Sequence, residues 1–341
     1  MNPLRILREV CVGETRQVLL DETEAAIALK LERSSESGKR LELGSKYEAR
    51  VRSVRTDQGG AFVEVARMGE AFLRSSPKHK FVEGEAIDIE VAAEPRLGKL
   101  ARVVLSDGNS SESGSIWDNV AVEDVTPGNE QVAAAFEEAL STHVTIPHGG
   151  RLHIERTKAL IAVDIDAAGR ADRGTAASRA LRLNTHAAQA LCRQLKLRNY
   201  GGLVVMDCVS PLNRNAGQKL QEVLKTSLAD YGMKEATVLA PSRLGLIEMS
   251  LPWLETPIAE RIHDENGSMA PESLNLAGLR MLEREALTSP MKRLTLELPA
   301  SAFTWLESEG AALRAGLAAK YGERFSYRNS TQQTPNVYLS S

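Results

Sequence analysis

Cysteine is scarce in this 341-residue chain, and its placement excludes two kinds of site. The three cysteines, Cys11, Cys192 and Cys208, are odd in number and far apart, and no C-x-x-C pair occurs. Disulfide frameworks are built from even sets of cysteines, and thiolate zinc sites from closely spaced pairs. The sequence therefore predicts neither kind of site, and it fits a reducing cytoplasm.

The chain also lacks an excess of positive charge and any long apolar run. Its 42 basic and 45 acidic residues give a net charge of −3, so the composition does not indicate nucleic-acid binding as a strongly basic chain would. Any RNA affinity must come from a local patch or from bound cations. No stretch approaches the roughly 18 apolar residues of a membrane span, and the N-terminus does not resemble a signal peptide. We therefore expect a cytoplasmic protein with no membrane partner.

Short runs of alternating apolar and polar residues fill the first third of the chain. Residues 1–43 include Ile27, Leu29 and Leu31 set against charged neighbours, which predicts an N-terminal β segment. Several further runs follow between 44 and 105, separated by glycine-containing turns. These runs are YEARVRSV, GAFVEV, EAIDIEV and KLARVVL. Short strands at this spacing predict a small closed barrel over 44–105.

The rest of the chain has a different pattern. The Ser- and Gly-rich stretch in 106–118 predicts a linker. Residues 119–265 alternate between helical and strand patterns, and the nearly continuous apolar strands are typical of an α/β sheet covered on its faces. Residues 270–341 predict a small α+β domain. The expected fold class is thus a multidomain α/β and α+β protein with a barrel near its N-terminus.

Aspartates close two of the predicted strands. Asp164 and Asp166 end the run ALIAVDID on the same strand face, and Asp207 ends GGLVVMD. If the two strands are neighbours, these carboxylates converge at the carboxyl ends, where open α/β sheets place ligands. Magnesium is the ion that suits one or two carboxylates plus phosphate oxygens. Each aspartate on its own fits a helix N-cap or a turn equally well, so the residues alone leave both interpretations open.

The predicted barrel contains a second candidate site. In GAFVEV, Phe62 falls on the opposite strand face from Ala61, Val63 and Val65, and Phe72 follows in the next segment. Exposed aromatics can stack on unpaired bases, and Lys99 in a nearby turn can contact a phosphate. The alternative is that both phenylalanines fill the barrel core.

Four segments of the chain, taken in order, resemble the ribonuclease E/G family. They are NEQVAAAFEEAL, PHGGRLHIERTKALIAVDIDAAGRADRG, LNTHAAQALCRQLKLRNYGGLVVMD and SRLGLIEMS. The barrel region looks like the S1-type OB-fold that this family inserts after its first strands, and ESLNLAGLRMLEREAL resembles the start of the family's small C-terminal domain. The resemblance implies a deoxyribonuclease-I-like core in 119–265 and single-strand-specific cleavage of RNA that leaves 5′-monophosphate ends.

The resemblance also implies roles for individual residues. Asp164 and Asp207 fall on the aspartates that bind the catalytic magnesium, for which manganese is an expected substitute. Asp166 falls where the family usually has a supporting asparagine, so this chain carries an extra negative charge there. The positions that grip RNA are occupied by Phe62, Phe72 and Lys99.

Several departures from the family pattern alter what is expected of this chain. The cysteines that link two protomers through zinc are missing from the segment after LGLIEMS, so neither zinc nor a cysteine–zinc dimer is expected. The basic run usual at that point is replaced by apolar and acidic residues. Only about 40 residues separate the barrel from the core, too few for the family's 5′-end sensor.

The leading hypothesis is therefore a magnesium-dependent endoribonuclease acting on single-stranded RNA, with Asp164, Asp207 and Asp166 as its catalytic residues. Two alternatives remain open at this point. The chain is either a non-hydrolytic RNA-binding relative, or a phosphatase that uses VDID as a D-x-D motif with a nucleophilic first aspartate.

Overall fold

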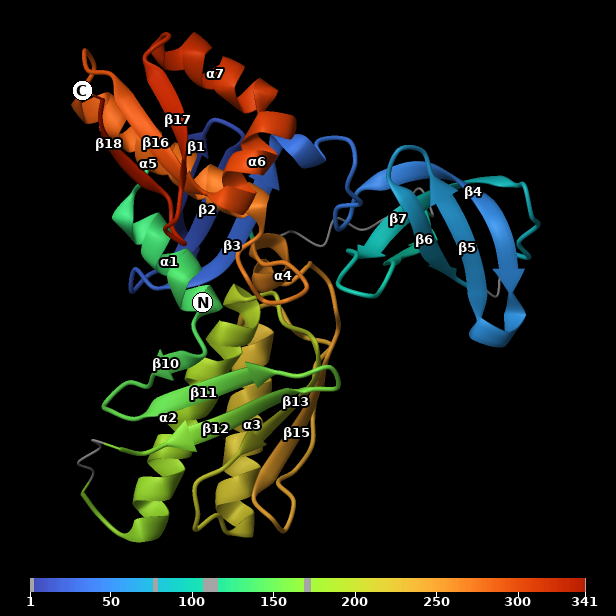
Figure 1. Ribbon diagram of the computed structural model, residues 1–341. Helices are drawn as coiled ribbons and strands as arrows, with labels where there is room; N and C mark the ends of the chain where they lie inside the picture. The colour runs from blue at the N-terminus through green and yellow to red at the C-terminus, as the bar shows by residue number, and fades with distance from the viewer. Residues whose placement is uncertain (1–2, 76–78, 107–115, 169–172, 341) are drawn as a thin grey trace.

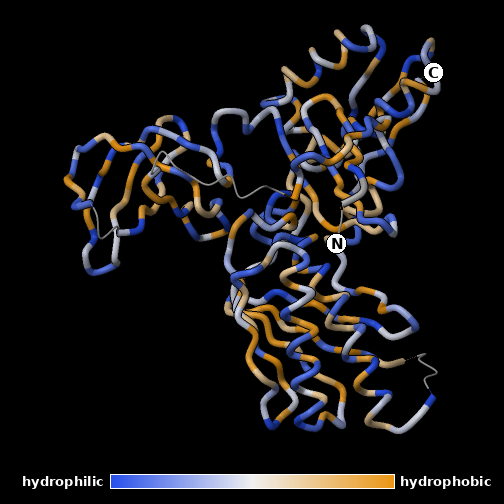
Figure 2. The backbone as a smooth tube through the Cα atoms, turned by 180° about the vertical axis from the view of Figure 1, so that it is seen from behind, coloured by the Kyte–Doolittle hydropathy of each residue, from blue (hydrophilic) through white to orange (hydrophobic). Residues whose placement is uncertain are grey.

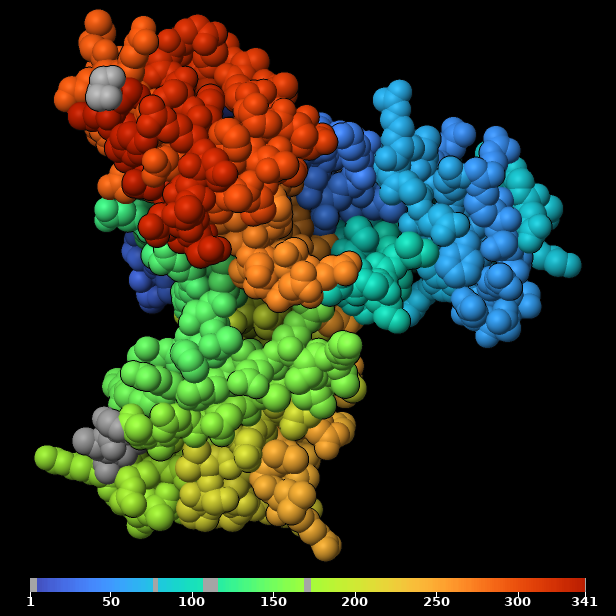
Figure 3. All heavy atoms as spheres, in the orientation of Figure 1, coloured from blue at the N-terminus to red at the C-terminus, as the bar shows by residue number. Residues whose placement is uncertain are grey.

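The computed structural model describes residues 3–75, 79–106, 116–168 and 173–340 (Figure 1). Most of the expected linker, residues 107–115, lies outside the described residues. The barrel projects to one side of the molecule, and the N- and C-terminal parts of the chain lie together above a second sheet (Figures 1 and 3). No helix in the described part of the chain is long and apolar enough to cross a membrane.

The N-terminal strands form a mixed sheet in the order β3-β2-β1-β9. Its elements are β1 Pro3–Cys11, β2 Glu14–Asp21, β3 Ala26–Arg33, the 3-10 turn η1 Ser34–Glu36 and β9 Val122–Val125. Helix α1 (Glu130–Leu140) begins at Asn129, whose side chain accepts a hydrogen bond from the Val132 amide at 3.0 Å. Val132 and Phe136 pack into the core of this sheet. The core expected over 119–265 includes β9 and α1, but both pack on the N-terminal sheet.

The expected closed barrel is present, in the order β4-β5-β6-β8-β7. Its elements are β4 Lys46–Arg55, η2 Thr56–Gln58, β5 Gly60–Val65, β6 Gly69–Arg74, β7 Ala86–Ala93 and β8 Ala101–Leu105. Inward-pointing residues alternate along each strand and fill the interior. A side chain at position 60 would clash with its neighbours. A Cβ on Gly60 would lie 2.2 Å from the Leu73 carbonyl oxygen and 2.6 Å from the Phe72 ring.

The second sheet has the order β10-β11-β12-β13-β15-β14. Its elements are β10 His143–Thr145, β11 Arg151–Arg156, β12 Ile161–Asp166, α2 Ala176–Leu197, β13 Gly202–Asp207, α3 Arg214–Asp230, β14 Thr237–Val238 and β15 Leu246–Leu251. Strands β12 and β13 run parallel and are connected through α2, as the sequence pattern predicts. The other neighbouring strands pair antiparallel, so the sheet is mixed.

Helices α2 and α3 lie together on one face of the second sheet (Figure 1). Their leucines share a core with Val163, Ile165, Val204 and Met206 of the strands. The view from behind shows hydrophobic segments gathered along these strands (Figure 2). Among the described residues no helix covers the opposite face, so the expectation of a sheet covered on both faces is wrong. We call this opposite face the open face.

The C-terminal part is an α+β unit whose sheet has the order β17-β16-β18. Its elements are α5 Pro271–Thr288, β16 Leu294–Pro299, α6 Ala300–Ser308, α7 Ala311–Tyr321, β17 Phe325–Ser330 and β18 Asn336–Leu339. Strand β18 pairs with β16, so the end of the chain is docked. Buried Glu283 joins this unit to the N-terminal sheet, accepting hydrogen bonds from the Val12 amide at 2.6 Å, Lys320 at 2.7 Å and Tyr321 at 2.8 Å.

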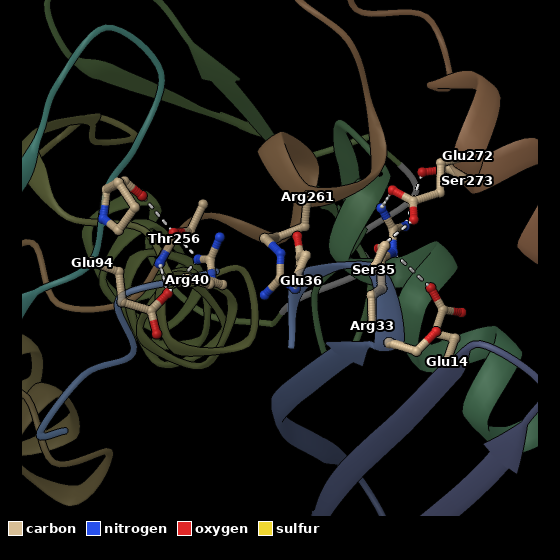
Figure 4. Close-up of polar contacts among 12 residues, drawn as sticks. Glu14, Arg33, Ser35, Glu36, Arg40, Glu94, Thr256, Arg261, Glu272 and Ser273 are labelled. Carbon is tan, nitrogen blue, oxygen red and sulfur yellow. Dashed lines mark hydrogen bonds and ion pairs between the residues drawn. The ribbon is translucent and has the colours of Figure 1, made fainter. Parts of the chain in front are cut away.

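A polar junction connects the barrel to the remainder of the molecule near helix α4 (Ile258–Ile262; Figure 4). Glu94, at the end of β7, forms an ion pair with Arg40 at 2.7 Å and accepts a hydrogen bond from the Thr256 amide at 3.0 Å. Arg261 pairs with Glu36 beside it. Burial alone would raise the pKa of Glu94, but Arg40 and the Thr256 amide hold this pKa below its ordinary value.

Candidate active site on the open face

Alternation along β12 and β13 decides which side chains reach the open face. Ala162 and Asp164 are exposed there, while Val163 and Ile165 are buried against the helices. On β13, Leu203 and Asp207 are exposed, and Val204 and Met206 are buried. A strand places successive side chains on opposite faces, so both aspartates belong to the face that the helices leave free.

The strand register brings Asp164 and Asp207 together. The last paired residues of β12 and β13 are Val163 and Met206, and the aspartates follow directly at the parallel strand ends. Both aspartates line one cavity of about 450 Å³, together with His153, Glu155 and Leu246. The structure thus places the two predicted metal ligands side by side on neighbouring strands.

Asp166 occupies a different position from the other two aspartates. It is half-buried, pairs in register with Arg151, and its Oδ1 accepts a hydrogen bond from the Ala168 amide at 2.8 Å. It does not line the cavity that Asp164 and Asp207 share. Its position fits a residue that supports the start of the following loop, not one that shares the cavity.

Buried Asn184 on α2 holds the segment after Asp207, and no sequence pattern singled it out. Its amide nitrogen donates to the Val209 carbonyl, and its oxygen accepts from the Val209 amide, both at 2.9 Å. Cys208 is buried between Asp207 and Val209, and burial together with the Asp207 charge raises the pKa of its thiol to about 12. A thiol with such a pKa is not a nucleophile at neutral pH.

The aspartate pair fits a hard, oxygen-preferring cation. Within the described residues no group of three or more His, Cys, Asp or Glu side chains forms a closed metal site. Magnesium does not need one, because it keeps several waters and is commonly held by one or two carboxylates plus substrate phosphates. Carboxylates at the ends of buried strands are costly to desolvate when they are themselves buried. Both are instead exposed, so cation binding would not have to offset a large burial penalty.

On the barrel, Phe62 and Phe72 form an outward-facing pair. They are directly opposite in register on β5 and β6, and their ring centroids lie 5.5 Å apart in an edge-to-face arrangement. Both are half-buried and lie outside the barrel core, so the alternative that they fill the core is wrong. Lys99 is exposed in the turn before β8.

A group of arginines lies near these barrel residues and near the second sheet. We call Arg74, Arg96, Arg102 and Arg156 the arginine seam. Arg102 pairs in register with Phe72 and donates to the Trp253 carbonyl at 3.0 Å. The guanidinium carbons of Arg96 and Arg156 lie 4.4 Å and 5.6 Å from the centroid of the Trp253 ring.

The charges of the arginine seam affect one another. Burial and the nearby Arg102 lower the pKa of Arg96, and burial and Arg74 lower the pKa of Arg102. Glu260 offsets part of this charge, because it forms an ion pair with Arg156. The seam is a local concentration of positive charge that the net charge of the chain does not reveal.

The same region of the chain is similar to known proteins. A family model described as the Ribonuclease E/G family matches residues 112–251, which contain both strand-end aspartates. This part of the chain is similar to the ribonuclease E/G family. The match includes the second sheet and both of the helices that cover it.

Curated relatives include ribonuclease E and ribonuclease G proteins. Ribonuclease E of Haemophilus influenzae is 32% identical over 190 residues, covering 52% of this chain and 20% of the relative. Ribonuclease E of Escherichia coli K12 is 31% identical over 190 residues, covering 52% and 17%. Ribonuclease G of Escherichia coli K12 is 32% identical over 115 residues, covering 34% and 23%. The chain thus spans about a fifth of the length of these relatives.

Proposed function

We propose that the chain is a magnesium-dependent endoribonuclease that hydrolyses single-stranded RNA and leaves 5′-monophosphate ends. The observation that carries this proposal is the pairing of Asp164 and Asp207 at adjacent strand ends, above one cavity on the open face. Similarity to the ribonuclease E/G family supports it.

In this proposal, Asp164 and Asp207 hold the cation, and manganese replaces magnesium. Bound there, the cation would lower the pKa of a water and stabilise charge on the phosphate and the leaving oxygen. Asp166 supports the loop after β12 through the Ala168 amide. Asn184 fixes the segment after Asp207, so the two carboxylates keep their spacing.

RNA binding is assigned to the barrel and the arginine seam. Phe62 and Phe72 would stack on unpaired bases, which makes a single strand the preferred substrate. Lys99 and the seam would contact phosphates between the barrel and the cavity. This arrangement lays one strand from the aromatic pair toward the aspartates.

The phosphatase alternative fits less well. A D-x-D phosphatase uses both of its aspartates at one reacting phosphate, whereas Asp164 lines the cavity and Asp166 does not. Nothing in that reaction needs the outward aromatic pair on the barrel.

The test uses an internally labelled single-stranded RNA and the full chain. Wild type is incubated with magnesium or with chelator, beside Asp164→Asn, Asp207→Asn and the matched control Asp230→Asn, which lies at the end of α3. We expect internal cleavage by wild type and Asp230→Asn with magnesium only, and none by the two site variants. Cleavage that survives both substitutions would refute the metal site. Binding without cleavage by wild type would instead identify a non-hydrolytic relative.

A further inference from the structure

Four chemically active side chains form a row across the open face. His143 pairs in register with His153, and His153 pairs with Asp164. Asp207 follows on the next strand, beside Asp164. The row therefore crosses β10, β11, β12 and β13, and the proposed ribonuclease reaction uses only its two aspartates.

The two histidines of the row approach each other through the same ring atom. Their Nδ1 atoms lie 2.9 Å apart, and the ring centroids lie 4.6 Å apart with the rings nearly perpendicular. His143 is exposed and His153 is half-buried. Two imidazole nitrogens at this distance can share one proton, because at least one of them must act as an acceptor.

A metal ion can take the place of that shared proton. Neutral imidazole nitrogen is a common ligand of zinc, copper and nickel, whereas magnesium prefers oxygen. Zinc–nitrogen bonds of about 2.0–2.1 Å in tetrahedral geometry place two ligand nitrogens roughly 3.3 Å apart. The two Nδ1 atoms need to separate by only a few tenths of an ångström to reach that spacing.

The chain provides an internal comparison for this pair. His148 and His186 also have their rings in contact, with centroids 5.0 Å apart, but these rings are tilted by only 36°. The rings of His143 and His153 are instead nearly perpendicular and meet through their Nδ1 atoms.

We propose that His143 and His153 form a chelating site for a borderline divalent cation such as zinc. The site adjoins the aspartate pair, because His153 also lines the cavity of Asp164 and Asp207, and waters complete its coordination. It differs from the cysteine-based zinc site whose absence the sequence indicates, because it needs no thiolate and joins no second protomer. It does not depend on whether the chain cleaves RNA.

The test is calorimetric titration of the full chain with zinc chloride at neutral pH. The variants are His143→Gln and His153→Gln, with His263→Gln near α4 as the matched control. His148→Gln tests the pair formed by His148 and His186. Circular dichroism establishes that each variant is folded. Copper serves as a second probe, because its electron paramagnetic resonance spectrum reports the number of bound nitrogens.

We expect wild type, His263→Gln and His148→Gln to bind one zinc ion with similar affinity. Either His143→Gln or His153→Gln should weaken binding about tenfold or more, since removing a ligand costs at least as much as removing its outer partners. The copper spectrum should change from two nitrogens to one. Absence of zinc binding by wild type, retention of affinity in the His143→Gln/His153→Gln double variant, or a loss confined to His148→Gln would each overturn the proposal.

Discussion

The second sheet and the barrel present their candidate residues in different ways. On the sheet, Asp164 and Asp207 lie at strand ends beside a cavity. On the barrel, Phe62 and Phe72 lie within strands and face outward as a pair. Carboxylates at strand ends suit a small ion, whereas an exposed aromatic pair offers a flat apolar surface to a base. We therefore expect metal binding and RNA binding to use separate parts of the chain.

The largest expected effect is on the sheet. Asp207→Asn should lower the single-turnover cleavage rate by about 100-fold or more, because one metal ligand loses its charge. The affinity for RNA without magnesium should change by no more than about twofold, since no phosphate contact is removed. Rapid-quench kinetics and fluorescence anisotropy measure the two quantities. Equal losses of cleavage rate and RNA affinity would contradict separate roles for the sheet and the barrel.

The next effect is on the barrel and has the opposite pattern. Phe62→Ala should weaken binding of single-stranded RNA by roughly 1–3 kcal/mol, as expected for one lost stacking contact. The cleavage rate at saturating RNA should remain close to that of wild type. Val104→Ala is the control, because it removes an exposed apolar side chain of β8 that lacks an aromatic face. If Val104→Ala weakens binding as much as Phe62→Ala, stacking is not the cause.

The polar junction between the two regions should respond to acid. The folded pKa of Glu94 is lowered, so its carboxylate stabilises the fold above its unfolded pKa of about 4.3. That stability is lost as the pH falls through the lower, folded value. Glu94→Gln should reduce the free energy of unfolding at pH 7 by roughly 1.5–3 kcal/mol. Denaturant melts at pH 7 and pH 3 measure this, and an equal difference between wild type and variant at both values would contradict it.

The smallest effect concerns Lys99. It is exposed, so Lys99→Ala should weaken RNA binding evenly across sequences and reduce the salt dependence of log Kd by about 0.7, the value for one contact to a single strand. Anisotropy titrations at several salt concentrations give this slope. An unchanged slope would show that Lys99 does not contact RNA. The arginine seam would then be the source of positive charge on the binding surface.

Local patterns predicted much of the site. Period-2 alternation placed Asp164 and Asp166 on one strand face, and the helix after β12 predicted that β12 and β13 are parallel neighbours. The covered-sheet prediction failed because Ala162, Leu203 and Val205, although apolar, lie on the open face. Apolar content alone could not distinguish a buried face from an exposed one.

Long-range contacts could not be predicted from the sequence. The pairing of β1 with β9 joins segments more than a hundred residues apart, and it carries α1 to the N-terminal sheet. The approach of Arg96 and Arg156 to Trp253 depends on how barrel and sheet are placed. His153 was missed for a different reason. Its strand alternates and could have marked it, but only the register shows that it lies opposite Asp164.

The central claim is that Asp164 and Asp207 together hold the catalytic cation. Manganese binding tests it most directly, by following the electron paramagnetic resonance signal of free manganese during titration of the full chain. Wild type, the Asp164→Asn/Asp207→Asn double variant and the Asp230→Asn control are compared at the same concentration. The account predicts that wild type and Asp230→Asn deplete the free signal and that the double variant does not. Equal depletion by all three proteins would contradict it.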